Sequence, residues 1–268
     1  MCSNKHRSNS TAYIRNEDIF TLNGECKSII KGGKQTSIIF ENSEGDYIIN
    51  AKNTAIESDG LLEFNSGIFN INSENGDAIK SKPRDSDKDS LGKILINDGT
   101  FNIQCFNDGI TSKNNIEIIK EKFNITTEKG YESETYNETE SSKGFKVTNN
   151  ETGCGIIINS GEFIINTADD AIHSNRDITI LTGKFKINTK DDAICAKFDL
   201  ILGPKDAPSE KLFINIENSY EALEGMTVTI YSGKIICKAI DDGINASSPV
   251  KEQREHHSWN ISRNQTWN

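Results

Sequence analysis

Residues 160–196 read SGEFIINTADDAIHSNRDITILTGKFKINTKDDAICA and contain the same short pattern twice. Phe163 recurs as Phe185 and Ile172 recurs as Ile194, and both pairs are 22 residues apart. The doubled aspartate of each half follows the same spacing. A fixed period of this length is typical of solenoid proteins, in which a repeat buries its apolar face only by stacking on its neighbours.

Each repeat contains signals for three short strands. Apolar and polar residues alternate around Phe163 and again around Ile178, which is the period of two expected of half-buried strands. A third strand is expected at Ala171 and Ile172, and Gly, Asp, Asn and Ser separate the three as turn-forming residues. The sequence therefore predicts an all-β fold, a right-handed parallel β-helix with about 22 residues per coil. A leucine-rich repeat has a similar length, but its leucine pattern and helical half are not seen.

Two ladders of apolar side chains are expected inside this solenoid, because equivalent residues of successive coils stack about 4.8 Å apart. The first ladder comprises Phe69, Phe101, Phe123, Phe163, Phe185, Ile214 and Ile235. The second, two residues later, comprises Ile71, Ile103, Ile125, Ile165, Ile187, Ile216 and Cys237. Longer spacings indicate insertions within residues 82–91, 130–142, 149–153 and 203–210, which we expect at corners on one face of the solenoid.

The repeat defines the expected domain organisation. Residues 36–247 are predicted to form the β-helix domain, whereas residues 1–35 show no repeat and are expected to be an irregular N-terminal cap or disordered. Residues 248–268 are expected to be an irregular tail, and because a solenoid that ends without a cap exposes its last core layer, the chain is expected to be truncated. We expect a monomer.

Composition excludes several classes of protein. The net charge of −10 disfavours nucleic acid as a partner, since such proteins neutralise phosphates with clustered Lys and Arg. The sequence contains no run of about 18 apolar residues, so no membrane-spanning helix is predicted. The six cysteines fall at different repeat positions and are expected to be free thiols. The N-terminus lacks the apolar segment of a secretory signal, so the chain is expected either to be intracellular or to have lost a leader.

Acidic residues recur at one corner of the repeat. Two positions before the apolar residue that follows the corner stand Asp77, Asp108, Lys143, Asp170, Asp192, Glu221 and Asp242. Carboxylates stacked within about 5 Å repel by roughly 3–4 kcal/mol at an effective dielectric near 20. We therefore expect Ca²⁺, a hard cation with six to eight oxygen ligands, to neutralise them. The expected ligands are Asp77, Asp108, Asp169, Asp170, Asp191, Asp192, Glu221, Asp241 and Asp242.

An alternative role for these residues is structural. Aspartates at tight corners often accept hydrogen bonds from backbone amides. That role explains one aspartate per corner but not the doubled aspartates, such as Asp169 with Asp170.

Three segments carry a resemblance to a known family: residues 160–180, 218–235 (NSYEALEGMTVTIYSGKI) and 238–247 (KAIDDGINAS). They resemble the calcium-binding, carbohydrate-binding β-helix family of cell-surface proteins from plant-fibre-degrading microbes, whose fold is similar to that of polysaccharide lyases. The similarity extends over residues 48–247 and implies that Glu224, with the doubled aspartates and Glu221, belongs to the acidic motifs. Lys143 and the Ala222-Leu223 pair depart from the family pattern.

The resemblance implies a function, with two alternatives. It implies a non-catalytic module that binds plant cell-wall polysaccharide, pectic (polygalacturonate) or cellulosic, with calcium bridging to acidic sugars, and an extracellular or cell-surface location. A calcium-dependent lyase acting by β-elimination would need in addition a general base, for which Lys113 and Lys197 are the candidates. A purely structural or adhesive repeat is the second alternative. We favour binding, and no catalytic or sugar-contacting residue is assigned.

Overall fold

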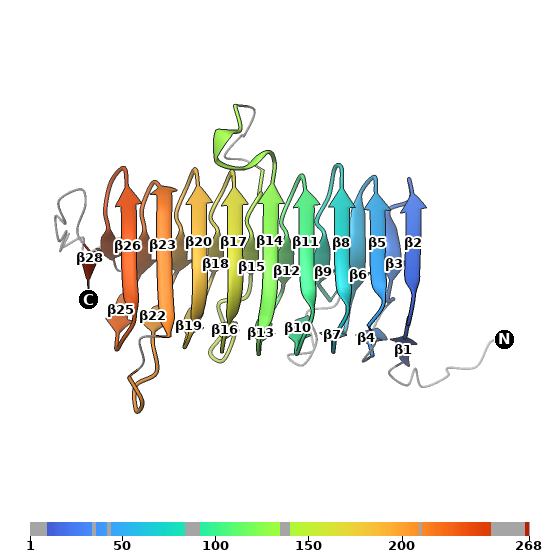
Figure 1. Cartoon of the computed structure of the whole chain (residues 1–268), viewed down its shortest axis with the longest axis horizontal. Coiled ribbons are helices and arrows are strands. Elements are labelled where there is room, and N and C mark those ends of the chain that lie inside the picture. Colours follow the sequence, from blue (N-terminus) through green and yellow to red (C-terminus); the bar gives the residue numbers. More distant parts are fainter. Residues whose placement is uncertain are drawn as a thin grey trace.

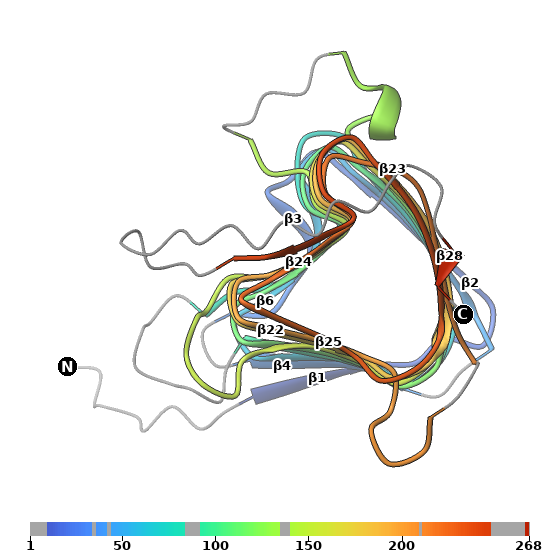
Figure 2. The same ribbon diagram turned by 90° about the vertical axis from the view of Figure 1, so that its left-hand side faces the viewer.

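The computed structural model describes residues 10–33, 36–41, 44–83, 92–134, 140–208, 211–247 and 266–267, the last two by their backbone. The fold is the predicted right-handed parallel β-helix (Figure 1). Viewed along its axis, the solenoid has three flat sides that meet at three corners (Figure 2). Within the described residues, no helix is long and apolar enough to cross a membrane.

Each coil contributes one strand to each of three sheets, which we name A, B and C in chain order. Sheet A comprises β1 (Ser10–Ile14), β4 (Thr36–Phe40), β7 (Leu61–Phe64), β10 (Lys93–Ile96), β13 (Asn115–Ile118), β16 (Gly155–Ile158), β19 (Asp177–Ile180), β22 (Asp199–Leu202) and β25 (Thr227–Ile230). Sheet B comprises β2 (Ile19–Gly24), β5 (Asp46–Ala51), β8 (Ile68–Ser73), β11 (Thr100–Cys105), β14 (Glu121–Thr127), β17 (Gly161–Thr167), β20 (Gly183–Thr189), β23 (Leu212–Ser219), β26 (Lys234–Ala239) and β28 (Thr266–Trp267). Sheet C comprises β3 (Ser28–Lys31), β6 (Thr54–Ser58), β9 (Ile79–Ser81), β12 (Ile110–Ser112), β15 (Phe145–Val147), β18 (Ile172–Ser174), β21 (Ile194–Ala196), β24 (Leu223–Gly225) and β27 (Ile244–Ala246).

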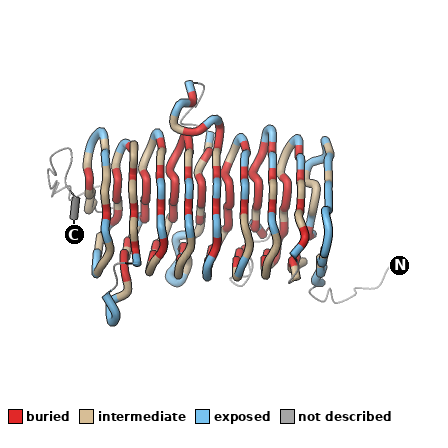
Figure 3. The backbone as a smooth tube through the Cα atoms, viewed as in Figure 1, coloured by how far each residue is buried: buried red, intermediate tan, exposed pale blue. Residues whose placement is uncertain are grey.

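The predicted aromatic ladder lies inside sheet B and extends one coil further, to Tyr47. Successive rings from Tyr47 to Phe185 stack face to face, and the rings of Phe163 and Phe185 are 4.4 Å apart with an angle of 2° between their planes. These rings are buried, and buried residues alternate with exposed ones along the strands (Figure 3). Each aromatic pair adds about 0.5–1.5 kcal/mol beyond the burial of its area, so the ladder fixes the register between coils.

The β-helix begins earlier than the sequence predicts. Residues 10–31 were expected to be irregular, but β1, β2 and β3 form a complete first coil on the strands of the next. Phe20 pairs in register with Tyr47, 27 positions later, and the two rings meet edge to face at 6.2 Å. The longer spacing and the partly exposed side chains of a terminal coil explain why the periodic pattern is weak here.

The insertions do not gather on one face, so that expectation is wrong. The loop that carries the 3₁₀ turn Gly130–Glu132 leaves the corner between sheets B and C, whereas the loop after β22 leaves the corner between sheets A and B (Figure 2). Most of the insertion predicted within residues 82–91 lies outside the described residues. In the tail, β28 pairs antiparallel with β26, and the rest of residues 248–268 is likewise outside them.

Candidate functional site: an acidic edge between sheets B and C

All nine predicted metal ligands lie where the chain passes from a strand of sheet B to a strand of sheet C. Because the coils are in register, these corners form one line along the solenoid, which we call the acidic edge. Its members are Asp77, Asp108, Asp169, Asp170, Asp191, Asp192, Glu221, Asp241 and Asp242. The contacts divide it into a lysine half, from Asp77 to Asp170, and an open half, from Asp191 to Asp242.

One carboxylate oxygen at these corners serves the backbone. Oδ1 of Asp77, Asp108, Asp170 and Asp192 accepts a hydrogen bond of 3.0–3.3 Å from the amide of the corner residue one coil later. The donors are the amides of Asp108, Lys143, Asp192 and Glu221. The structural role considered from the sequence is therefore real. It occupies one oxygen and leaves Oδ2 for a cation.

In the lysine half, side chains from sheet C supply that cation. Lys80 forms an ion pair with Oδ2 of Asp77. The ammonium group of Lys146 lies 3.2 Å from Oδ2 of Asp108, whose other oxygen also accepts a hydrogen bond of 2.5 Å from Ser141. Both aspartates are buried, so each carboxylate is compensated within the protein.

Lys143, the departure from the acidic pattern, is itself a counter-ion. Its ammonium nitrogen lies 2.5 Å from Asp169 Oδ1 and 2.7 Å from Asp170 Oδ2. Burial lowers the pKa of Lys143, but the charges of Asp170 and Asp169 outweigh burial and raise that pKa above its ordinary value. Lys143 therefore keeps its charge and neutralises the middle of the edge.

His173 also contacts this part of the edge. His173 is only 8% exposed, and its Nδ1 lies 2.7 Å from Asp170 Oδ2. Its Nε2 is 3.0 Å from Asn175 Oδ1. Burial raises the pKa of Asp170, but hydrogen bonding to His173 and the charge of Lys143 leave the pKa below its usual range. Asp170 is thus an ionised, fully satisfied carboxylate.

The open half repeats the corner geometry at Asp192. Oδ1 of Asp192 accepts the Glu221 amide at 3.2 Å, and within the described residues no Lys or Arg pairs with either side chain. Burial and the charges of neighbouring acids raise the pKa of Asp192 to about 9. Burial also raises the pKa of Glu221 to about 6, although hydrogen bonds from Asn245 oppose the change. Asp192 and Glu221 thus have no cationic partner among the described residues, and Asn245 supplies the hydrogen bonds to Glu221.

Carboxylates converge at two places on the edge. One oxygen each of Glu221, Asp241 and Asp242 lie within 4.8 Å of one another. The same holds for a group formed by Asp169, Asp170 and Asp191. Asp77 and Asp108 belong to no such group among the described residues, because lysines occupy their positions facing sheet C.

One column of sheet C contributes to the division of the acidic edge, together with the corner residue Lys143. The column lies one residue after the buried apolar residue of each C strand and reads Lys80, Thr111, Lys146, His173, Cys195, Glu224 and Asn245 in register. Its two lysines, Lys80 and Lys146, lie beside the lysine half, and its last three members, Cys195, Glu224 and Asn245, lie beside the open half. Sequence analysis missed His173 and Cys195 as neighbours of the edge, although aligning the repeats on the apolar residue would have placed both in this column.

Donor chemistry distinguishes the groups that could hold a metal. Glu221, Asp241 and Asp242 offer only carboxylate oxygens, which suit a hard cation such as Ca²⁺. Two other groups contain Cys195, one with Asp170 and His173 and one with Asp192 and Glu224. Their sulfur and imidazole donors are softer than carboxylate oxygens. Burial raises the pKa of the Cys195 thiol, and Cys195 donates a hydrogen bond of 2.6 Å to Glu224. Asp169, Asp170 and Asp191 also form an all-oxygen group, but Lys143 already pairs with Asp169 and Asp170. Among the described residues, the group at the end of the open half therefore has the donor chemistry that suits a hard cation without a competing lysine.

The two lysines considered as general bases lie after sheet C strands, beyond the acidic corner. Lys197 reaches back to Glu224, with 3.2 Å between its ammonium nitrogen and Oε2. Burial lowers the pKa of Lys197, but Cys195 and Glu224 raise it above its ordinary value. Lys113 follows β12, and its amide donates to the Ser81 carbonyl at 2.9 Å.

A family model described as "Carbohydrate-binding domain-containing protein" matches residues 3–193, more than half of the chain. The chain belongs to this family. Comparisons with curated proteins and with solved structures gave no match. The β-helix is thus a carbohydrate-binding domain, and the matched residues include the lysine half and the start of the open half.

Proposed function

We propose that this carbohydrate-binding domain binds an acidic plant cell-wall polysaccharide, of the polygalacturonate type, through Ca²⁺ held on the open half of the acidic edge. The observation that carries the proposal is the convergence of Glu221, Asp241 and Asp242 within 4.8 Å. No Lys or Arg forms an ion pair with these three residues in the part of the chain that the structure describes. Such a ligand lies outside cells, so the proposal places the protein in an extracellular or cell-surface location.

Calcium resolves an electrostatic conflict. The chain carries a net charge of −10, and a polyuronate is also negatively charged, so direct contact would be repulsive. A bound cation held by protein carboxylates keeps ligand positions for sugar carboxylates, because Ca²⁺ takes six to eight oxygens and three side chains do not complete its shell. The edge residues would hold the ion, and the ion would supply the attraction.

The lyase alternative is less well supported. β-Elimination needs a base that is neutral before it abstracts a proton. The pKa of Lys197 is raised rather than lowered, since Cys195 and Glu224 outweigh the effect of burial. This favours binding without catalysis, and membership of a carbohydrate-binding family favours binding over a purely adhesive repeat.

Retention on immobilised polygalacturonate tests the proposal. We expect the wild-type protein to be retained with Ca²⁺ and released by a chelator, and no unsaturated product to absorb in the ultraviolet. Asp241→Asn combined with Asp242→Asn should abolish retention. Glu117→Gln, a change at an exposed residue on sheet A, is the matched control and should be retained like the wild type. Retention that is insensitive to chelator, or product formation that Lys197→Ala abolishes, would contradict the proposal.

A further inference from the structure

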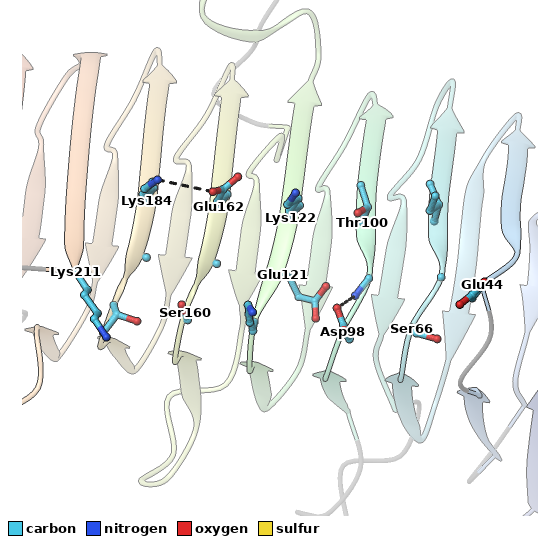
Figure 4. A pocket seen from close by; sticks show the side chains of 17 residues that line it. Glu44, Ser66, Asp98, Thr100, Glu121, Lys122, Ser160, Glu162, Lys184 and Lys211 are labelled. Carbon is cyan, nitrogen blue, oxygen red and sulfur yellow. Dashed lines mark hydrogen bonds and ion pairs between the residues drawn. The ribbon is translucent and has the colours of Figure 1, made fainter.

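A second surface feature lies at the opposite margin of sheet B, where the chain passes from sheet A to sheet B. A groove of about 580 Å³ runs along this corner (Figure 4). Its lining extends from Glu44, before β5, to Lys211, before β23. The seven coils between these residues span roughly 29 Å at about 4.8 Å per coil. The groove is therefore long and straight and runs parallel to the solenoid axis.

Glycines form most of the floor. Gly67, Gly99, Gly161 and Gly183 follow one another in the lining, with φ between 115° and 142°. A Cβ atom added at Gly99 or Gly183 would lie 2.9 Å from the carbonyl oxygen of the glycine one coil earlier. The column therefore requires glycine, and the missing side chains leave a trough in which a ligand can approach the backbone.

Glu121 interrupts this glycine column. It pairs in register with Gly161, and its φ is not in the left-handed region, so the backbone accepts a side chain there. Figure 4 shows the side chain directed along the groove toward Asp98. Glu121 is 3% exposed, and neither carboxyl oxygen has a hydrogen-bond partner within the described residues. A buried polar group left unpaired typically destabilises a protein by about 1–3 kcal/mol, so its presence needs a reason.

The carboxyl is a hydrogen-bond donor at neutral pH. Burial, with a further contribution from the charge of Asp98, raises the pKa of Glu121 to about 9. A protonated carboxyl donates one hydrogen bond and accepts others. Sugar hydroxyl groups offer both complementary roles.

The rest of the lining carries little net charge and is rich in hydroxyl groups. Besides the protonated Glu121, its acidic members are Glu44, Asp98 and Glu162, and its basic members are Lys120, Lys122, Lys184 and Lys211. Its hydroxyl-bearing members are Ser66, Thr100, Ser160 and Thr182. Three carboxylates against four lysines are a weak attraction for a strongly anionic polymer, so hydrogen bonding to hydroxyl groups dominates the recognition that this lining offers.

We propose that the groove binds a neutral polysaccharide chain lying parallel to the solenoid axis, with Glu121 hydrogen-bonded to a sugar oxygen directly or through one water molecule. The proposal shares with the proposed function only the premise that the domain binds glycans. It does not depend on calcium. The protein then has two glycan sites, one on each margin of sheet B, for ligands of different charge.

Calorimetric titration with a neutral β-1,4-glucan hexasaccharide, in the presence of a chelator, tests the groove. Glu121→Met keeps the size of the side chain and removes its hydrogen bonds, so affinity should fall about 10-fold, which corresponds to one hydrogen bond of about 1.4 kcal/mol. Glu121→Gln keeps a donor and should stay within about 3-fold of the wild type. Glu117→Gln, an exposed residue on sheet A outside the groove, is the control and should bind like the wild type.

Thermal unfolding separates a ligand-binding role from a structural one. Because Glu121 is unpaired in the free protein, Glu121→Met should leave the melting temperature unchanged or higher while it lowers affinity. No heat of binding from the wild type, or equal affinity of Glu121→Met, would overturn the proposal. The double variant Asp241→Asn, Asp242→Asn should still bind the glucan but should no longer bind polygalacturonate. The experiment thus tests the groove separately from the acidic edge.

Discussion

The lysine half and the open half of the acidic edge share one backbone geometry and differ in what compensates their charge. Asp108 and Asp192 each accept the amide of the next coil on Oδ1, at 3.0 and 3.2 Å. On Oδ2, Asp108 meets Lys146, whereas Asp192 has Cys195 and Glu224 nearby. The same carboxylate is thus a structural ion pair in one coil and a candidate metal ligand a few coils later, and the neighbouring column of sheet C makes the difference.

This difference shows how a repeat can diversify without changing its fold. The corner aspartate is needed in most coils for its hydrogen bond to the backbone. The residue facing it varies more, from Lys80 and Lys146 to Glu224 and Asn245, and one coil has Lys143 at the corner itself. Buried charges must be compensated, so a coil that loses its lysine must gain a proton or a bound cation.

The largest effect is expected from removing the lysine at the boundary. Lys143→Met would leave Asp169 and Asp170 buried without their shared counter-ion, and breaking a buried pair in this way typically destabilises a protein by about 3–5 kcal/mol. Denaturant unfolding in chelator should show this loss. If the two halves differ only in their cation, Ca²⁺ should restore part of the stability by occupying the vacated position. A decrease of less than 1 kcal/mol in the free energy of unfolding is what an exposed ion pair would give. It would show that Lys143 is not what distinguishes the lysine half from the open half.

A smaller effect is expected in the open half, and only when calcium is present. An ion that binds only the folded protein stabilises it by about 2.7 kcal/mol at 100 times its dissociation constant. Asp241→Asn with Asp242→Asn should remove that gain while leaving stability in chelator unchanged or higher. Asp108→Asn is the matched change in the lysine half and should destabilise equally with and without Ca²⁺. Melting temperatures measured in both conditions give the comparison.

Glu121 offers a third case beside the two halves of the acidic edge. It is a buried carboxyl for which the described residues supply no lysine partner and for which no metal is proposed. Its pKa of about 9 in the folded protein lies above the ordinary value of 4.5, so the folded state keeps a proton that the unfolded state loses. The contribution of Glu121 to stability is therefore complete below pH 4.5 and is lost as pH rises toward 9. The other charged groups lining the groove are Glu44, Asp98, Glu162, Lys120, Lys122, Lys184 and Lys211.

Unfolding free energies measured in chelator at pH 5 and pH 8.5 should therefore fall less in Glu121→Gln than in the wild type. The amide does not ionise, so the variant removes only the effect of this one group. An identical fall in both proteins would mean that Glu121 is ionised in the folded state.

The smallest effect is expected at an exposed acid–lysine pair. Glu162 and Lys184 lie 3.9 Å apart on the outside of sheet B, and both side chains are more than half exposed. Lys184→Ala should change the unfolding free energy by about 0.5 kcal/mol or less, because solvent screens such pairs. A larger change would show that burial is not what separates the acidic edge from ordinary surface pairs.

The sequence alone predicts the architecture because its information is repeated. The spacing of Phe163 and Phe185 defines the length of the repeat. From that length follow the interior ladder, the three strands per coil and the corner position of Asp170. The first coil escaped prediction because, among the described strands, it pairs with a neighbour on one edge only, which relaxes the requirement for buried residues such as Phe20.

The division of the acidic edge was harder to predict than its position. The sequence shows that Lys143 departs from the acidic column, but not that its ammonium group reaches Asp169 and Asp170 of the following coil. Such contacts depend on side-chain direction across coils, which the spacing of residues does not contain. Glu121 illustrates the same limit of sequence-based prediction. Its place in the glycine column follows from the register of the coils, but the sequence does not show that its side chain is buried without a hydrogen-bond partner among the described residues.

The cross-coil lysines also have a mechanical consequence. Lys143 reaches forward to the next coil, and Lys146 reaches back to the previous one, so both contacts lie parallel to the solenoid axis. A force that pulls the coils apart must break them together with the sheets in that half, because they connect coils in the direction of the load. In the open half the corresponding connections would be calcium ions. The resistance of that end to stretching would then depend on the calcium concentration around the protein, which single-molecule pulling in calcium and in chelator would measure.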